Sequence, residues 1–264
     1  MINNQLIYLF GYTFYFNPQI NIKIRINMIN NKFHKHFFIL FFLTILLGCG
    51  NPDASHHIDI ALEAEHRTPS YIKRDKYRHP KETLLFFGLN PEQSIVEITP
   101  GYGWYAEILA PLIRNKGQYY YTSLKLHEKI NPYFVKVEKA FKEKMEKNPD
   151  IYDQLQWVHF DPKQPEFAPN GPVDMVLTFR NVHNWAKAGS AEAMFAGFAE
   201  ALKPGGILGL VEHRAKVGTS LKKQIKSGYM TEDYVIQMAK DSGFRLDAKS
   251  EINANPKDTA DHPK

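Results

Sequence analysis

The stretch of sequence that decides the fold is residues 94–105, SIVEITPGYGWY. A short β-branched run at 95–98 breaks into Pro100, Gly101 and Gly103, and a helical pattern of apolar residues follows as far as Ile113. This order predicts a buried strand, a tight turn and the start of a helix, which is the opening unit of a nucleotide-binding α/β sheet. Glycine is needed in such a turn because a side chain would hold a ligand away from the N–H groups at the helix N-terminus. Thr99 stands where the usual fingerprint has its first glycine.

Further segments stand on both sides of this turn: RDKYRHP at 74–80, ETL at 82–84, FFGL at 86–89, most of 97–111, DMVLTFRNVHNW at 174–185, LKPGG at 202–206 and SEINANPKD at 250–258. These segments resemble the predicted exported methyltransferases of the class I S-adenosylmethionine (SAM) dependent superfamily. Together they extend over about residues 70–264. The resemblance implies a doubly wound, Rossmann-like α/β sheet of the class I methyltransferase type, SAM as cofactor, and methyl transfer to a small molecule.

The resemblance also implies a set of site residues. The cofactor-binding set is Glu97, Pro100, Gly101, Gly103, Trp104, Tyr105, Asp161, Arg180 and Asn181, and the catalytic pair is His183 and Asn184. In a doubly wound sheet, the loop that follows the fourth strand faces the glycine turn. His183 is therefore interpreted either as a general base on a hydroxyl or amine, or as an imidazole that braces the loop, while Arg180 or Asn181 fixes a carboxylate or carbonyl.

Other polar residues at the expected strand ends have two interpretations each. Asp161 follows the third strand, where its carboxylate either reaches the adenine edge or forms a turn before Pro162. No Asp or Glu ends the second strand to accept hydrogen bonds from the ribose hydroxyls, and the polar residues there are Ser123, Lys125 and His127. Further candidates, each with a purely structural alternative, are Tyr77, Arg78 and His79 before the first strand and Glu212, His213 and Arg214 after the fifth.

Apolar patterning predicts one α/β domain at 68–264, a size that buries a full core. Strands are expected at 95–98, 118–122, 155–160, 173–178, 207–211 and 244–252, with helices at 80–88, 131–147, 190–202 and 231–242. No further apolar run follows residue 252, so we expect a sheet that lacks its seventh strand. The domain is expected to be a monomer.

The first part of the chain has the pattern of a lipoprotein signal. Residues 28–49 contain Met28, two lysines, an apolar run too short to span a bilayer, and then Leu-Leu-Gly-Cys49. This end resembles a lipobox, which implies acylation of Cys49 and location in the bacterial cell envelope, and Gly50 resembles the residue that directs lipoproteins to the outer membrane. Residues 1–27 are interpreted as an over-extended N-terminus, and 50–67 as a tether that leads into a short helix.

Charge and composition limit the kinds of binding partner that are expected. The net charge is +5, but residues 1–48 contain four basic and no acidic residues, so the remainder carries 29 basic and 28 acidic ones. This balance removes the charge argument for a nucleic-acid partner. His56, His57 and His66 have no cysteine or carboxylate cluster at ligand spacing, so no metal is expected. Membrane contact is expected only through the lipid anchor.

The sequence leaves three classes of function open. The first is an exported, lipid-anchored SAM-dependent methyltransferase. The second is a catalytically inactive binding lipoprotein that keeps the fold, since SAM is made in the cytoplasm while the signal directs the domain out of it. The third is a structural lipoprotein of the envelope.

Overall fold

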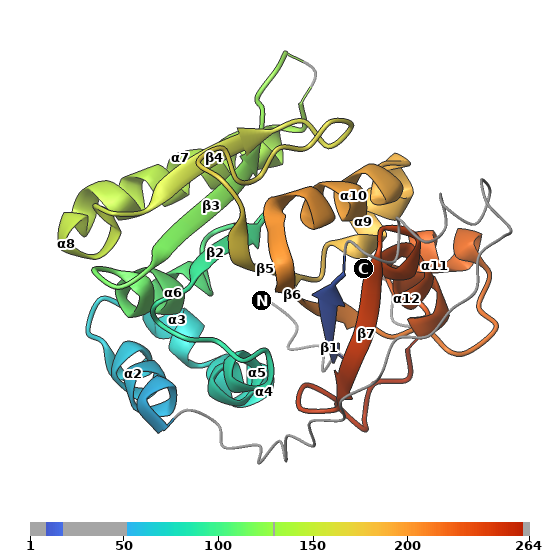
Figure 1. The fold of residues 1–264 in the computed structure, drawn as a ribbon, viewed down its shortest axis with the longest axis horizontal. Helices are drawn as coiled ribbons and strands as arrows, with labels where there is room; N and C mark the ends of the chain where they lie inside the picture. Colours follow the sequence, from blue (N-terminus) through green and yellow to red (C-terminus); the bar gives the residue numbers. More distant parts are fainter. Residues whose placement is uncertain (1–8, 18–51, 129, 261–264) are drawn as a thin grey trace, which may run out of the picture.

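The computed structural model describes residues 9–17, 52–128 and 130–260, and they build one seven-stranded sheet. The strand order is β4-β3-β2-β5-β6-β1-β7 (Figure 1). The strands are β1 (Leu9–Phe16), β2 (Ser94–Ile98), β3 (Gln118–Leu124), β4 (Gln156–Phe160), β5 (Val173–Phe179), β6 (Leu202–His213) and β7 (Phe244–Ser250). The six strands predicted from apolar patterning are all present, and the doubly wound class is confirmed.

The five strands from β4 to β6 pair in parallel. At the centre, Ile95 of β2 lies opposite Tyr119 of β3 on one side and Met175 of β5 on the other. The two inner strands read as almost continuous apolar runs because both of their faces are covered, which is the usual state of a parallel sheet.

The seventh strand comes from the N-terminal segment. β1 pairs antiparallel with both β6 and β7, so that Tyr12 lies opposite Leu210 on one side and Lys249 on the other. Tyr12 and Phe14 are 1% and 0% exposed, which makes β1 part of the core. The prediction that the sheet lacks a seventh strand was therefore wrong, because the strand was sought after β7 and lies before the signal-like segment. A translation start at Met28 stays a prediction, and such a chain would have no β1.

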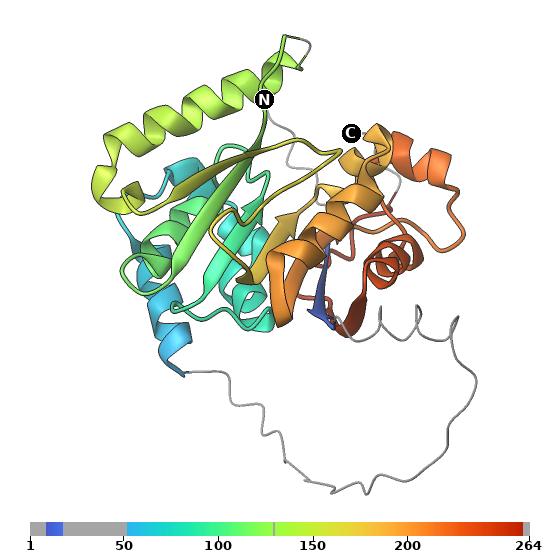
Figure 2. The same ribbon diagram turned by 45° about the horizontal axis from the view of Figure 1, so that its top comes forward.

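Different helices cover the two faces of the sheet, as Figure 2 shows from a second direction. On one face Ile95, Tyr119 and Met175 share a core with apolar side chains of α2, α5, α6, α7 and α8. The helices on this side of the chain are α2 (Pro52–Glu63), α3 (Pro69–Ile72), α4 (Asp75–Arg78), α5 (Pro80–Phe86), α6 (Ala106–Ile113), α7 (Pro132–Lys147) and α8 (Pro149–Tyr152). The segment predicted as a tether thus contains α2, whose Ile58 is fully buried.

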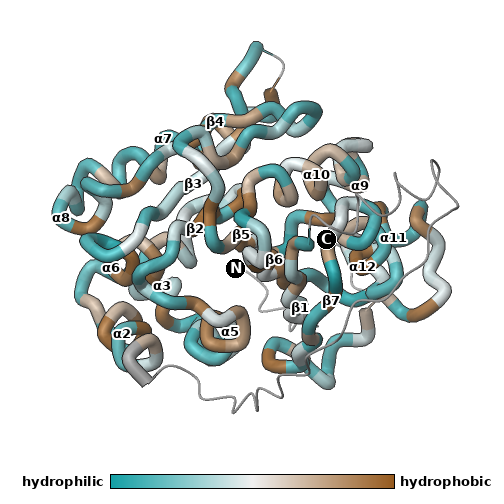
Figure 3. The backbone as a smooth tube through the Cα atoms, viewed as in Figure 1, coloured by the Kyte–Doolittle hydropathy of each residue, from teal (hydrophilic) through white to brown (hydrophobic). Residues whose placement is uncertain are grey.

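On the other face Val96, Tyr120 and Val176 pack against the later helices. These are α9 (Val182–Ala188), α10 (Ala191–Ala201) and α12 (Glu232–Asp241), with α11 (Leu221–Ser227) beside α9. The helix predicted at 131–147 is α7, along which apolar and polar residues alternate (Figure 3), as in an amphipathic helix. No helix among the described residues is long and apolar enough to cross a membrane.

Candidate active site

The candidate site lies where β2 and β5 end side by side. From β2 the chain goes through α6 to β3, and from β5 it goes through α9 and α10 to β6, so the connections leave in opposite directions. In an open α/β sheet, ligands bind beyond the carboxyl ends of the strands at such a switch point. The predicted glycine turn and the loop after the fourth strand therefore belong to the same end of two neighbouring strands.

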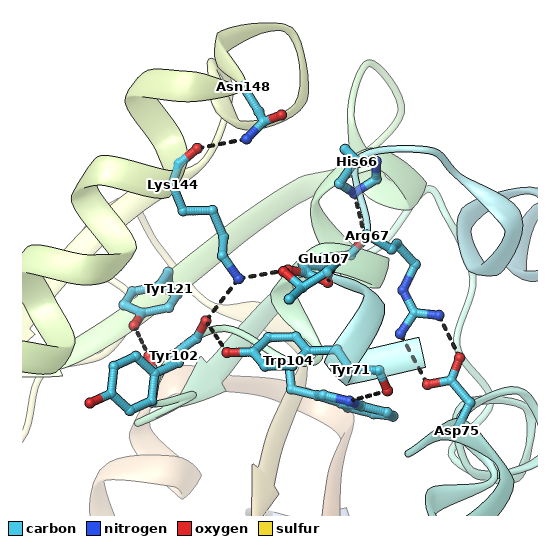
Figure 4. A network of polar contacts seen from close by, with 12 residues as sticks. His66, Arg67, Tyr71, Asp75, Tyr102, Trp104, Glu107, Tyr121, Lys144 and Asn148 are labelled. Atoms are coloured by element: carbon cyan, nitrogen blue, oxygen red, sulfur yellow. Dashed lines mark hydrogen bonds and ion pairs between the residues drawn. The ribbon is translucent and has the colours of Figure 1, made fainter. Parts of the chain in front are cut away.

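The glycine turn is held through its carbonyl groups. The Tyr121 hydroxyl donates to the Gly101 carbonyl at 2.5 Å, and Tyr71 and Lys144 donate to the Tyr102 carbonyl at 3.3 and 3.1 Å (Figure 4). The N–H groups of Gly101 and Tyr102 donate to no acceptor in the described part of the chain. The turn therefore presents free donors beside the start of α6, which is the arrangement that binds anionic or electron-rich groups.

The two glycines of the turn have different reasons to be glycine. Both have left-handed backbones, with φ of 65° at Gly101 and 76° at Gly103. A Cβ at Gly101 would meet no heavy atom within 4 Å, whereas a Cβ at Gly103 would clash with the Phe141 ring. Gly101 therefore leaves open space in front of the turn, and Gly103 is required by packing.

The two aromatic residues of the predicted cofactor set are buried in the core. The indole Nε1 of Trp104 donates to the Tyr71 carbonyl at 3.1 Å. The Tyr105 ring stacks on Phe179 with ring centres 3.8 Å apart. Both side chains are at most 5% exposed, so their evident role is to fix the turn against β5 and the N-terminal helices.

Glu97 and Thr99, on either side of Ile98 at the end of β2, are unusual. Glu97 is 2% exposed and accepts a hydrogen bond from the Tyr119 hydroxyl at 2.5 Å. Burial raises the pKa of its carboxyl to about 8. Thr99 has a left-handed backbone with φ of 49°, and its hydroxyl is buried without a partner. A β-branched residue in this conformation is strained, and such strain is concentrated at functional sites.

The loop after β5 is tied to the end of β2. The Asn181 amide donates to the Ile98 carbonyl at 2.9 Å and to the Thr178 hydroxyl at 3.2 Å. Arg180 has a left-handed backbone with φ of 62°, and its N–H donates to the Val211 carbonyl at 2.7 Å. Asn181 therefore joins the two strand ends, while the Arg180 side chain has no hydrogen bond to a described residue.

His183 is oriented by a buried carboxylate. Its Nδ1 lies 3.2 Å from both oxygens of Glu212, a residue that is 1% exposed at the end of β6. The backbone N–H groups of His183 and His213 also donate to Glu212. A carboxylate at Nδ1 favours the tautomer with its proton there, which leaves Nε2 as the basic nitrogen. Asn184, the other predicted catalytic residue, is exposed on α9.

The ends of β3 and β4 contain the remaining predicted residues. Asp161 is exposed and accepts from the Lys163 N–H at 2.9 Å, as expected of the turn interpretation. No acid ends β3, but Glu138 of α7 lies there, 3.3 Å from the Ser123 hydroxyl and 3.2 Å from His159 Nε2. Its carboxylate therefore lies beside the end of β3, where the sequence has no acid of its own. The sequence predicted a helix at 131–147 but no site residue within it, so Glu138 was missed.

Glu107 is a second residue that was missed. Its side chain is fully buried and accepts from the Thr68 N–H and hydroxyl at 2.9 and 2.5 Å and from Lys144 Nζ at 2.6 Å (Figure 4). His66 contacts its backbone carbonyl at 2.8 Å. The available signal was a single acid inside the apolar run 106–113. This network fixes α6 to α7 and to the segment before α3.

No group of three or more potential metal ligands occurs among residues 9–17, 52–128 and 130–260. Cys49 lies outside the described residues.

Comparison with known proteins supports the fold. No family model and no curated protein matches the chain. Among solved structures, a SAM-dependent methyltransferase from Aquifex aeolicus is similar with a TM-score of 0.51 and 18% identity, over 74% of this chain and 90% of that one. The glycopeptide N-methyltransferase MtfA is similar with a TM-score of 0.47 and 15% identity, over 70% and 87% of the two chains. The first of these similarities, together with the strand order of the sheet, shows that the chain has the fold of SAM-dependent methyltransferases.

Proposed function

We propose that the protein is a SAM-dependent methyltransferase acting on a small molecule. The observation that carries the proposal is the turn at 100–103. Its carbonyls accept hydrogen bonds from protein side chains, and the N–H groups of Gly101 and Tyr102 donate to no acceptor in the described part of the chain. Next to it, the buried Thr99 hydroxyl has no partner. These unpaired groups fit a polar ligand such as the amino-acid part of SAM, and they lie at the switch point of a methyltransferase-type sheet.

Each part of the site has a distinct task in this proposal. The glycine turn and Thr99 would bind SAM, Glu138 would accept from its ribose, and SAM would supply the methyl group. His183 would remove a proton from the acceptor through Nε2, because Glu212 orients the imidazole through Nδ1. Asn181 holds the loop in register with β2. Much of the rate acceleration in such a transfer comes from aligning the two reactants.

Calorimetry with S-adenosylhomocysteine (SAH) on the full chain tests the proposal. We expect binding by the wild type and a loss of about tenfold or more in Gly101→Val, because the new side chain keeps the ligand from the free N–H groups. Gly205→Val is the matched control, since Gly205 has a similar φ of 80° and equally open surroundings but precedes the buried part of β6. Equal SAH affinity in wild type and Gly101→Val would refute the assignment of the turn.

The alternative function is ligand binding without chemistry, and His183 separates the two. In a methyltransferase, His183→Ala should leave SAH affinity nearly unchanged and lower turnover by about 10² or more. In a binding protein the same substitution should change affinity only. The buried Glu212 beside His183 favours the enzyme, because a carboxylate that orients an imidazole is a common feature of a general base.

Export and lipid attachment at Cys49 form a separate proposal, supported by the sequence pattern of residues 28–49. Cleavage before Cys49 would also remove β1, the strand that joins β6 to β7. A chain starting at Gly50 should therefore be much less stable than the full chain in urea denaturation. Equal stability would show that the domain does not need β1 and is compatible with cleavage.

Labelling tests the same proposal directly. Radioactive palmitate should enter the wild-type protein in cells and should not enter Cys49→Ser. Recovery of unprocessed, unlabelled protein in the cytosol would contradict export, and it would leave the methyltransferase proposal intact.

A further inference from the structure

Three arginines gather beside the glycine turn without a carboxylate partner. Arg78 ends α4 and is 8% exposed, Arg180 follows β5 and is half-buried, and Arg74 lies exposed before α4. The Arg78 guanidinium lies 4.6 Å from the centre of the Trp104 ring, which places it against the turn. Within the described part of the chain, no carboxylate pairs with any of the three, whereas the buried Arg67 is paired with Asp75 at 2.5 Å.

The backbone brings the three arginines together. The Arg78 N–H donates to the Arg74 carbonyl at 3.1 Å, and Arg180 directly follows Phe179, whose ring stacks on Tyr105 beside the turn. In agreement, burial lowers the pKa of Arg78 to about 8, with further lowering by Arg180 and Arg74. Burial also lowers the pKa of Arg180, and Arg74 adds to the effect. A guanidinium keeps its proton at neutral pH, so the cluster has an uncompensated positive charge.

The nearest acids do not balance this charge. Glu97 lies close enough for Arg78 to affect it, but burial raises its pKa to about 8, so it is mostly neutral at neutral pH. Glu212 raises the pKa of Arg180, yet it makes no ion pair with it and instead contacts the His183 ring and two backbone N–H groups. Burying a charged group without a partner destabilises a fold, so such a cluster is expected where a ligand supplies the counter-charge.

Backbone strain accompanies two of the three arginines. Arg180 itself has φ of 62°, and His79, directly after Arg78, has φ of 41°. Non-glycine residues rarely adopt this conformation, and they persist where the surrounding structure forces a side chain into a functional position. The strain thus falls at Arg180 itself and at the residue directly after Arg78.

We propose that Arg74, Arg78 and Arg180 bind an anionic group, a carboxylate or a phosphate, of the methyl acceptor. The planar guanidinium binds both of these groups through two parallel hydrogen bonds. SAM has a sulfonium, an ammonium and one carboxylate, so it is cationic overall and cannot neutralise three arginines. An anionic acceptor would supply the missing negative charge. The inference rests on the proposed function, because it assigns the charge to the molecule that receives the methyl group.

Phosphate is the probe for the anion site. In the full chain at constant ionic strength, replacing chloride by inorganic phosphate should raise the melting temperature of the wild type. Arg78→Met should melt at or above the wild-type temperature without phosphate and should lose the phosphate effect, with affinity lower by about tenfold or more. Arg180→Met should also lose the effect and serves as a second variant if Arg78→Met does not fold.

Arg67→Met is the matched control. Arg67 is as buried as Arg78 and also contacts the Trp104 ring, with its guanidinium 5.8 Å from the ring centre, but it is paired with Asp75. The Arg67 variant should melt at a lower temperature and keep the phosphate effect. If phosphate stabilises wild type and both cluster variants equally, the proposed anion site does not exist.

SAH and 5′-methylthioadenosine distinguish the two sources of the anion, because the second compound lacks the amino-acid carboxylate. If the acceptor supplies the anion, Arg78→Met should bind both compounds as tightly as the wild type does. Weaker binding of SAH alone would assign the cluster to the cofactor and overturn the proposal. Failure of the wild type to bind SAH would refute the proposed function, while the phosphate result would still stand on its own.

Discussion

Two groups of charged residues that include a contact with the Trp104 ring differ in how their charges are balanced. In the first group Arg67 is paired with Asp75, and Glu107 accepts from Thr68 and Lys144 (Figure 4). In the second group Arg78 has no acidic partner and lies near two further arginines. A balanced network stabilises the fold without a ligand, whereas an unbalanced one costs stability until a ligand binds. Substitutions in the two groups should therefore change stability with opposite sign.

Glu107→Ala should have the largest effect, because it removes the central acceptor of the balanced network. Without the carboxylate, Lys144 loses its ion-pair partner and the Thr68 N–H and hydroxyl lose their acceptor. Breaking a buried pair in this way costs about 3–5 kcal/mol. Urea denaturation measures the loss, and Glu143→Ala on the exposed face of α7 is the control, expected within about 0.5 kcal/mol of wild type. A loss below about 1 kcal/mol in Glu107→Ala would contradict the structural role of this network.

Glu97→Gln should change how stability depends on pH. The folded-state pKa of Glu97 is raised to about 8 from an ordinary value of 4.5, so the folded protein holds a proton that the unfolded chain releases. Stability from this group is fully present below pH 4.5 and is lost as the pH rises through 8, by about 1.4 kcal/mol per pH unit within that window. The stability of Glu97→Gln relative to wild type should therefore rise by about 2–3 kcal/mol between pH 6 and pH 8.

The measurement is urea denaturation at several pH values between 5 and 8.5. Glu143→Gln is the control for a general effect of removing one negative charge, and it should follow the wild-type pH dependence. Parallel curves for wild type and Glu97→Gln would mean that Glu97 is ionised in the folded protein and that it balances part of the charge of Arg78.

Asn181→Ala tests whether the loop after β5 stabilises the fold in the absence of a ligand. The substitution removes the hydrogen bond that joins the loop to the end of β2 and a second one to Thr178 of β5, so the protein should lose about 1–3 kcal/mol. His183→Ala should cost less than this, since His183 is partly exposed and Glu212 keeps two backbone donors. The melting temperatures of the two variants measure these losses. Equal losses would indicate that His183 also braces the loop.

Thr99→Gly should have the smallest effect, and it should be stabilising. Glycine adopts φ of 49° without strain, and the substitution removes a buried hydroxyl that has no partner. We expect a gain of about 0.5–1 kcal/mol by thermal denaturation, with SAH affinity lowered if the hydroxyl contacts the ligand. A loss of stability would show that the Thr99 side chain contributes packing and stabilises the fold without a ligand.

The sequence predicted the parallel sheet and the position of its switch point well, because both depend on local patterns. The run at 94–105 combines a buried strand, a glycine turn and a helix start within 12 residues. The same local signal does not tell Gly101 from Gly103, since the difference depends on Phe141, a residue of the distant α7. Tertiary contacts of this kind are not visible in a single sequence.

The polar contacts were the least predictable part of the site. Glu107 lies in the segment 97–111 that resembles the methyltransferases, and its partner Lys144 is 37 positions away on a different helix. Glu138 was overlooked for the same reason, because an acid from α7 lies where an acid from β3 was expected. Strand β1 was set aside because the segment before Met28 was interpreted as extraneous, although Tyr12 and Phe14 are core residues. Their partners, β6 and β7, come at the other end of the chain.

The position of β1 also affects how the protein is made. β1 emerges from the ribosome first, while β7, one of the two strands that it joins, emerges last. At a synthesis rate of about 5–20 residues per second, the roughly 230 residues between them impose a delay of roughly 10–50 seconds. β1 has no partner strand until β6 has emerged, and it is paired on both edges only after β7 has followed.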